Sequence, residues 1–575
     1  MRRANKTKQK QVPNFVPWEK LSKHIRDINI GKVKDISEFT KGVDEEEVGP
    51  GCYRPFGKYA LRLAEHYIRV DKNREDKLRE FPYYAKKDPS SILFLLAIGG
   101  DGAPAIGTSY LASFLNAGKR VASSSENFLI FGADVKEDGK VVKNYLASLV
   151  KDLEFLESKV HDVTVDTKSY KVEFKVAALP NDLKNLAFLA GELNMKAKYP
   201  STFGNVSSDD MNKHHKVYGK DWLPFDYDKR LADADKVRDK KKELLGKNFT
   251  DDMELTEAQR RILTPYIASL ESRQEFKPLV KEFIKIAKVD CLHLKNNAVK
   301  VQFDKCLQIV IEYVKIPKGV RMYKRLDDNN LFVFLVAFVR KMMKCGSLSK
   351  KLIRFFESDP SLKSNKPFDV RFTGRESFMF LQFFPLLIDE LKSKVPLKAH
   401  QTLCAIFHQT LLLRQLVSYS VRIDDISFED VEVMRQLGRQ LFKSYCFYDD
   451  SMTPSQWTFT NVAPYHCKEL LLQTGMGLGV NTMEGREQKH QQLRKYSTKA
   501  TFQNKWFTVF RHEFIHNVYL KEESFDTVRY KKKGKRYVPV AEPGQCNKCC
   551  LVLSGNVCAW CDSPDMIKMS ERVSS

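Results

Sequence analysis

The chain has 575 residues, 43% of them hydrophobic, and its formal net charge is +24 at pH 7. A chain of this length holds roughly two to four domains, and so large a positive charge favours a polyanionic partner, above all nucleic acid. No membrane span is expected, because the most apolar run, residues 331–339, is too short to cross a bilayer.

The N-terminal region, residues 1–90, is basic with short amphipathic stretches and is predicted to form a small helical DNA-binding module. Its first residues, MRRANKTKQKQ, do not resemble a signal peptide. Basic clusters at residues 2–10 and 531–536 (KKKGKR) suit nuclear import or phosphate contact, and equally a solvated charged surface. The protein is therefore predicted to lie inside the cell, in the nucleus.

From residue 91 the pattern changes to that of a sheet. The run at residues 91–98 is almost wholly apolar and is followed by two glycines and Asp101, as expected for a strand with neighbours on both sides. The predicted elements are, in chain order, strands at 91–98, 108–115 and 127–133, a helix at 141–160, a strand at 170–179 and a helix at 183–193. Three strands, a helix, a strand and a helix is the order of an RNase H-like domain.

Strand order decides which carboxylates can meet. The strand reached by the helical crossover lies beside the first strand, about 4.8 Å away, and leads to Asp182. The third strand lies roughly 10 Å from the first, so Asp134 at its end is expected to be a strand-end cap or an outer group. Asp101 and Asp182 are therefore expected to share a divalent ion, for which carboxylate oxygens are suitable ligands.

The region from 201 to 480 is predicted to be a large helical insertion, because apolar residues recur there at spacings of three and four. The segments with this spacing are 255–289, 301–316, 331–344, 378–394, 399–421 and 431–447. Within the insertion, the basic run KVRDKKK at residues 236–242 is as consistent with a solvated surface as with DNA contact.

A helix predicted within residues 481–497 (NTMEGREQKHQQLRKYS) carries Glu484 and Glu487 on one face. A third carboxylate near two strand-end aspartates is what two-metal phosphodiester chemistry requires. In that chemistry two Mg²⁺ or Mn²⁺ ions about 3.5–4 Å apart activate the attacking oxygen and stabilise the leaving oxygen. The cations that follow, Lys489, Arg494 and Lys495, are then expected to bind DNA phosphates.

Taken in order, these residues resemble a known family, the catalytic core of the vertebrate V(D)J recombinase and its transposon relatives, the Transib-type and related DDE transposases. The resemblance covers about residues 91–520. It runs through Asp101-Gly102, the strand leading to Asp182, CLHLKNN at 291–297, APYHCKEL at 463–470, and EGRE at 484–487 with LRKYS behind it.

The resemblance implies a DNA transposase or recombinase that cleaves and joins double-stranded DNA at transposon ends. Asp101, Asp182 and Glu487, rather than Glu484, would hold two Mg²⁺ or Mn²⁺ ions, and the enzyme would act as a homodimer on terminal repeats and target DNA. The alternative is a domesticated DNA-binding protein that keeps the fold and has lost cleavage.

One departure from the family concerns zinc. The family holds a zinc ion with two cysteines after the second aspartate and two histidines before the glutamate. Ser201 and Gly204 stand at the matching cysteine positions, whereas His466 is retained. That zinc site is therefore expected to be absent, with the insertion anchored by packing or by a relocated site.

Near the C-terminus, cysteines paired at two-residue spacing predict a structural zinc site. The predicted ligands are Cys546, Cys549, Cys558 and Cys561, with Cys550 competing for the position of Cys549. The basic run just before them is predicted to bind DNA through Lys531, Lys532, Lys533, Lys535 and Arg536.

Several other side chains are ambiguous. His512–His516 spells HExxH, a zinc-protease signature, but an apolar stripe on the same helix favours a structural role. For His490 a surface position is favoured over metal contact, and His293 is expected to be buried or to join domains. For Trp457 and Trp506, core packing is favoured over stacking on a base.

The overall prediction is an α/β plus all-α protein with an RNase H-like mixed sheet. Its parts are a basic N-terminal region (1–90), the first part of the core (91–200), a helical insertion (201–480), the final core helices (481–525), and a basic linker with a small zinc module (526–575).

Overall fold

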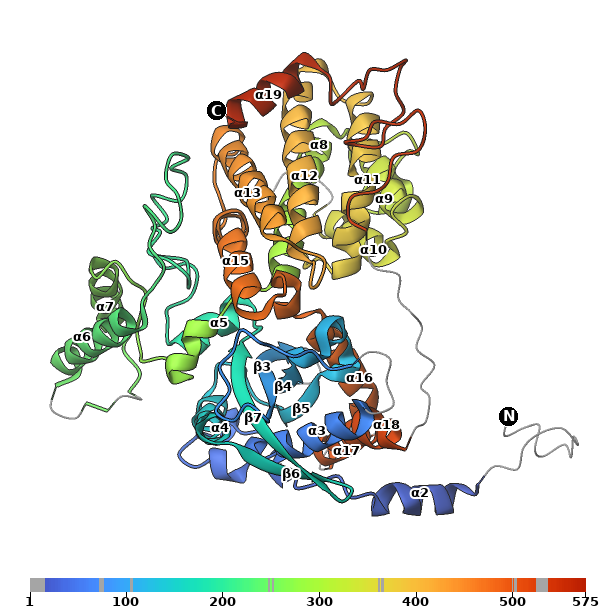
Figure 1. The fold of residues 1–575 in the computed structure, drawn as a ribbon. Helices are drawn as coiled ribbons and strands as arrows, with labels where there is room; N and C mark the ends of the chain where they lie inside the picture. Colours follow the sequence, from blue (N-terminus) through green and yellow to red (C-terminus); the bar gives the residue numbers. More distant parts are fainter. Residues whose placement is uncertain are drawn as a thin grey trace, which may run out of the picture.

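The computed structural model describes residues 16–71, 77–103, 107–246, 249–250, 253–359, 362, 367–498, 500, 504–523 and 536–574. The predicted DNA-binding residues Lys531, Lys532, Lys533 and Lys535, and the basic cluster at 2–10, lie outside these ranges. The described residues form a mixed α/β fold in which a body built on a sheet adjoins a larger helical body (Figure 1).

The sheet has seven strands in the order β1-β2-β5-β4-β3-β7-β6. Their bounds are β1 (Lys34–Asp35), β2 (Gly51–Tyr53), β3 (Ile92–Ala103), β4 (Gly107–Phe114), β5 (Phe128–Ala133), β6 (His161–Val165) and β7 (Lys168–Ala178). β3 pairs antiparallel with β4 and parallel with β7. The predicted adjacency is therefore confirmed, because β7 lies beside β3 while β5 lies two positions away.

Helices cover both faces of this sheet, which is why β3 is apolar throughout its first half. They are α3 (Phe56–Asp71), α4 (Lys140–Ser158), α5 (Leu183–Ala190), α16 (Glu484–Ser497), α17 (Lys505–Phe514) and α18 (Leu520–Glu522). Successive side chains of β4 point to opposite faces of the sheet and so belong to different clusters. Tyr110 belongs to the main core, where its ring packs on Tyr145 of α4, and Leu111 packs in a second cluster with Leu493 and Trp506.

The N-terminal region is part of the sheet body, whereas the sequence predicted a separate module. β2 pairs with the edge of β5, and α3 buries Leu63 and Tyr67 in the main core. The first helix, α2 (Trp18–Asp27), has no buried residue of its own. The strands β1 and β2 are too short to give a sequence signal. Their formation depends on the pairing of β2 with β5, which lies far along the chain.

The helical body contains most of the predicted helices. Its elements are α8 (Cys291–Tyr313), α9 (Leu331–Lys341), α10 (Gly346–Ser358), α11 (Gly374–Lys392), α12 (His400–Ser420), α13 (Phe428–Tyr448), α14 (Pro454–Trp457), η9 (Thr458–Val462) and α15 (Ala463–Thr474). The helices α6 (Tyr227–Leu245) and α7 (Glu257–Ser269) lie apart from it, beside α5, and pack on each other, while η6 (Lys281–Ile286) contacts α6 and β7 (Figure 1). One prediction was wrong. Residues 255–289 are not one helix, because the backbone after α7 leaves the helix to bond with residues 191 and 193, which follow α5.

The C-terminal module is packed against the helical body. The ring of Trp560 stacks on Phe407 of α12 with centroids 4.6 Å apart, and its Nε1 donates to Asp389 at 2.7 Å. The last helix, α19 (Pro564–Ser574), contacts α12 and α13. Among the described residues, each helix is too short or too polar to cross a lipid bilayer.

Candidate functional site

Two strand ends bring Asp101 and Asp182 to the same edge of the sheet. Asp101 lies near the end of β3, and β7, which runs parallel to β3, leads directly to Asp182. Asn181 Oδ1 accepts a hydrogen bond from Gly100 N at 2.7 Å, which ties the two strand ends together. Asp182 caps α5, because its carboxylate accepts from the backbone N–H of Asn185 at 2.7 Å.

The third carboxylate, Glu487, reaches this edge because α16 is anchored on β3. The guanidinium of Arg486 is fully buried and donates to Ala97 O at 3.2 Å and to Ser113 Oγ at 3.1 Å. β3 leaves room for it at Gly99, where a Cβ would lie 2.7 Å from Arg486 Nε. Burial lowers the pKa of Arg486 to about 9.

The electrostatics of Asp101 reflect these neighbours. Its pKa is raised to about 8, first by burial and then by the negative charges of Glu487 and Asp182. Two nearby carboxylates disfavour the charged form of a third, whereas a nearby cation stabilises that charged form. The oxygen donors present therefore fit a hard divalent ion such as Mg²⁺ or Mn²⁺.

Two histidines flank the carboxylates, and for His490 the favoured surface position was wrong. The side chain of His490 is 7% exposed; its Nδ1 lies 3.6 Å from Asp101 Oδ2 and its Nε2 lies 3.0 Å from Ser109 Oγ. Burial lowers the pKa of His490. It is held inside because it lies on a face of α16 that meets the sheet, where Arg486, one turn earlier, bonds Ala97 of β3 and Ser113 of β4.

His293 belongs to the helical body and joins it to the sheet body, as predicted. Its Nε2 lies 3.4 Å from Glu487 Oε1, and its Nδ1 donates to Asp290 Oδ2 at 2.5 Å. Burial lowers the pKa of His293, but the bonds to these two carboxylates outweigh it and raise the pKa well above its usual value. The hydrogen bond from His293 lowers the pKa of Glu487.

The carboxylates face one another without forming a closed cluster. Within the described ranges, only the four C-terminal cysteines form a group of three or more metal-ligating side chains whose ligand atoms all lie within 4.8 Å of one another. At least one pair among Asp101, Asp182 and Glu487 is therefore further apart than this. Asp134 lies apart from them, where its Oδ1 accepts from Lys505 Nζ at 2.5 Å and from Trp506 Nε1 at 3.2 Å.

The predicted phosphate-binding role of Lys489 was wrong, because this side chain is inside the protein. Its Nζ lies 2.8 Å from Glu513 Oε1, and neither side chain is exposed to solvent. Arg494 and Lys495, one to two turns further along α16, are exposed, as is Arg536. These three remain available to an anion.

The same ion pair explains the HExxH segment. Its glutamate, Glu513, is buried against Lys489 and also accepts from Asn517 Nδ2 at 2.8 Å. The helix widens to a π-helix at η11 (Ile515–Tyr519), which contains the second histidine of the motif, His516. Trp506 and Trp457 are buried, 2% and 0% exposed, as favoured from the sequence.

Packing occupies the region where the resembling family holds zinc. The ring of His466 meets that of Phe203 edge to face, with centroids 4.7 Å apart, and its Nδ1 accepts from Val289 N at 3.2 Å. Ser201 is buried and bonds the backbone of Phe203. These contacts pack the segment around Ser201 against His466 of α15.

The candidate zinc centre consists of Cys546, Cys549, Cys558 and Cys561, all buried. The backbone resolves the competition between neighbouring cysteines, because Cys550 has φ +66° and its Sγ turns toward Pro539 O, 3.8 Å away. Hydrogen bonds, first of all from Cys561, lower the pKa of Cys549 to about 6. Four thiols at this spacing can hold one tetrahedral Zn²⁺ ion.

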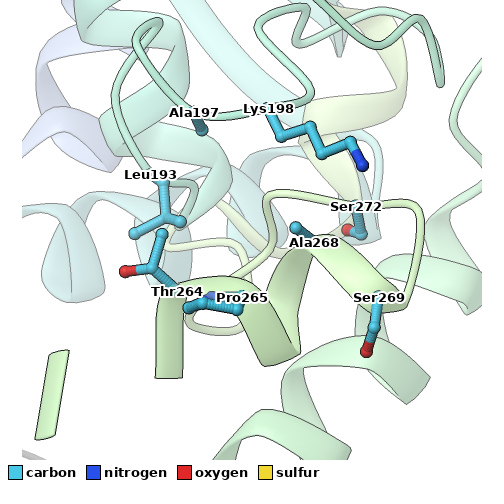
Figure 2. A pocket seen from close by; sticks show the side chains of 8 residues that line it. All are labelled: Leu193, Ala197, Lys198, Thr264, Pro265, Ala268, Ser269 and Ser272. Carbon is cyan, nitrogen blue, oxygen red and sulfur yellow. The ribbon is translucent and has the colours of Figure 1, made fainter. Parts of the chain in front are cut away.

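A pocket of about 440 Å³ lies elsewhere, between the segment after α5 and helix α7 (Figure 2). Leu193 and Ala197 face Pro265 and Ala268 across it, and Lys198 is its only ionisable lining residue. It contains none of the candidate metal ligands.

Comparison with known proteins finds no protein-family model that matches the chain and no curated protein that matches its sequence. The family resemblance therefore rests on the motifs and spacing quoted above.

Proposed function

We propose that the chain is a DDE-type DNA transposase or recombinase with an RNase H-like core that cleaves and joins DNA at transposon ends. The observation that carries this proposal is the approach of Asp101, Asp182 and Glu487 to one sheet edge, where β3 and β7 are parallel neighbours and α16 is anchored on β3 through Arg486. The RNase H-like assignment is supported by the pairing of β3 with antiparallel β4 and parallel β7.

Asp101, Asp182 and Glu487 would hold two Mg²⁺ or Mn²⁺ ions. Bound there, such ions activate an attacking oxygen and stabilise the leaving oxygen of a phosphodiester. The chain's own residues set the positions of the ligands. Arg486 fixes α16 on β3, and His293 orients the Glu487 carboxylate from the helical body.

The proposed substrate is double-stranded DNA, in keeping with the net charge of +24. Arg494, Lys495 and Arg536 are exposed and suit contact with phosphates. Action as a homodimer is proposed from the family resemblance alone, and location in the nucleus is proposed from the basic character of the chain.

The test is metal-dependent nicking of DNA that carries the flanking terminal repeats, measured in Mn²⁺. Wild type is expected to nick, and Asp182→Asn is expected to lose nicking because a metal ligand is gone. Asp134→Asn is the matched control, since Asp134 bonds Lys505 and Trp506 away from the site. Nicking by Asp182→Asn at the wild-type rate would exclude the proposed ligand set.

A second function, DNA binding without cleavage, is favoured by the state of Glu487. This carboxylate is engaged by His293, and the three carboxylates do not form a closed cluster. A protein of this kind would bind the same DNA with equal affinity in wild-type and Asp182→Asn forms, and neither form would nick in Mn²⁺.

A further inference from the structure

One arginine of the helical body is buried against the candidate zinc centre. Arg414 lies on α12 and is 1% exposed. Its Nη2 donates to the backbone carbonyl of Lys548, which stands between Cys546 and Cys549 in the first pair of cysteines. The guanidinium of Arg414 therefore reaches the turn that carries two of the four candidate zinc ligands.

Arg414 has no carboxylate partner. Among the residues that the structure describes, no ion pair joins it to an acid. Its Nη1 lies 3.5 Å from Leu381 O, its Nε donates to no described atom, and its Cζ lies 5.2 Å from the ring centroid of Phe384. A buried cation is costly unless an anion lies beside it, so the charge of Arg414 requires a partner in this part of the fold.

The nearby groups that can carry negative charge are thiols. Burial lowers the pKa of Arg414, and the charges of Cys550, Cys549, Cys561 and Cys546 act in the opposite direction. The last three of these cysteines are candidate zinc ligands. Zinc binds cysteine as the thiolate, so a Zn²⁺ ion held by four cysteines carries an excess of two negative charges. An occupied zinc centre would therefore supply the counter-charge of the guanidinium.

The second pair of cysteines is also fastened to the helical body. Trp560 lies within this pair, stacks on Phe407 of α12 with ring centroids 4.6 Å apart, and donates to Asp389 of α11 at 2.7 Å. Each pair of cysteines thus has its own contact with the helical body, the first through Arg414 and the second through Trp560 (Figure 1). Both contacts depend on how the two pairs are placed relative to each other.

We propose that Arg414 is the charge partner of the zinc centre, so that zinc binding and docking of the C-terminal module on α11 and α12 are coupled. A bound ion fixes the two pairs of cysteines relative to each other, which places Lys548 O on Arg414 and Trp560 on Phe407. Docking in turn brings a cation to a centre of negative charge, which favours zinc. The inference rests on the candidate zinc centre and is independent of DNA cleavage.

The first test is the zinc affinity of the full chain, measured by competition with a chelating dye. Arg414→Met removes the charge and is expected to weaken zinc binding about 10–100-fold, the usual effect of losing a group that supports metal ligands. Arg414→Lys keeps the charge and is expected to bind zinc more tightly than Arg414→Met.

Arg54→Met is the matched control and is expected to leave the zinc affinity unchanged. Arg54 is also 1% exposed, donates to a backbone carbonyl, Ile30 O, and lies over an aromatic ring, that of Tyr59, but it belongs to the sheet body. Within the described ranges it too has no ion pair.

Thermal unfolding with zinc and in EDTA separates the proposed role of Arg414 from a purely structural one. With zinc, Arg414→Met is expected to lower the Tm, because the zinc centre loses its counter-charge. In EDTA the same change is expected to lower the Tm less or not at all, because the cation has no anion to pair with. Arg54→Met is expected to lower the Tm equally in both conditions. Equal losses for Arg414→Met with and without zinc, or an unchanged zinc affinity, would overturn the proposal.

Hydrogen exchange of the wild-type chain gives a second measurement, which does not depend on the folding of a variant. Removal of zinc is expected to speed exchange in residues 546–561 and also in the parts of α11 and α12 that they cover. Faster exchange in residues 546–561 alone would overturn the coupling, as would a wild-type chain that binds no zinc. Nicking in Mn²⁺ is read separately, so a chain that never nicks refutes the proposed cleavage and leaves the role of Arg414 intact.

Discussion

Replacing Lys489 with methionine removes the cation from a buried ion pair and leaves the Glu513 charge without a partner. Lys489 Nζ lies 2.8 Å from Glu513 Oε1, with both side chains 0% exposed, and it also donates to Ser124 O at 3.1 Å. Breaking such a pair costs about 3–5 kcal/mol, whereas a change at an exposed lysine costs about 0.5 kcal/mol or less. For a folded unit of roughly 150–250 residues, this loss of unfolding free energy corresponds to a fall in Tm of roughly 6–20 °C.

The assay is thermal unfolding of the full chain, with Lys495→Met as the matched control on the same helix, since Lys495 is exposed. Lys489→Met/Glu513→Met is expected to recover much of the lost stability, because no unpaired charge remains buried. If Lys489→Met and Lys495→Met melt at the same temperature and only Lys489→Met weakens DNA binding, then Lys489 faces the DNA and the buried position is refuted.

Three further changes test other parts of the structure. Cys558→Ser is expected to abolish the binding of one zinc ion per chain, whereas Cys550→Ser keeps it; equal zinc contents after dialysis would contradict the assigned ligands. Burial raises the pKa of Glu522, but hydrogen bonds from His66 and Arg62 of α3 outweigh burial and lower this pKa to about 2. The Glu522 carboxylate therefore stabilises the fold above its usual pKa of 4.5, and this stabilisation is lost as the pH falls toward 2. In urea unfolding at a series of pH values, Glu522→Gln should make the free energy of unfolding less dependent on pH in this range. An unchanged pH dependence would argue against the assigned role of Glu522. Gly99→Ala places a Cβ 2.1 Å from Pro180 O and 2.7 Å from Arg486 Nε, and is expected to cost about 1–3 kcal/mol or more. Gly346→Ala, with open space around it, should be neutral, and similar midpoints for the two variants would refute the close approach of Pro180 and Arg486 to β3.

The sheet and its carboxylates could be predicted from the sequence because their signals are local. The apolar run of β3 and the apolar spacing of α4 mark their elements directly, and the crossover rule predicts a strand after α4 that lies parallel to β3. In the structure the edge strand β6 follows α4, and the next strand, β7, is the one that pairs parallel with β3. That rule alone placed Asp182 rather than Asp134 beside Asp101.

The burial of α16 could not be predicted, because its sequence lacks an apolar stripe. Arg486, Lys489 and His490 are 2%, 0% and 6% exposed, yet each is an ordinary surface residue by type. Their burial is made tolerable by partners from β3 and from Ser124, hundreds of residues away in the chain, and by Glu513 of the next helix, α17. A pattern of charges on one helix contains no information about such distant partners.

The contacts at the inner end of the helical body show that it forms one wall of the carboxylate site. Asp290, at the start of α8, accepts from Met483 N at 2.8 Å, just before α16, and Asn481 Nδ2 donates to Lys288 O at 2.9 Å. His293 follows one turn later and reaches Glu487. A movement of α8 against the sheet must therefore displace His293 from Glu487 or carry α16 with it, and in either case the distance from Glu487 to Asp101 changes. If Asp101, Asp182 and Glu487 are metal ligands as proposed, the position of the helical body would decide whether they can approach a common cation, whereas a protein that only binds DNA would keep the contact between His293 and Glu487.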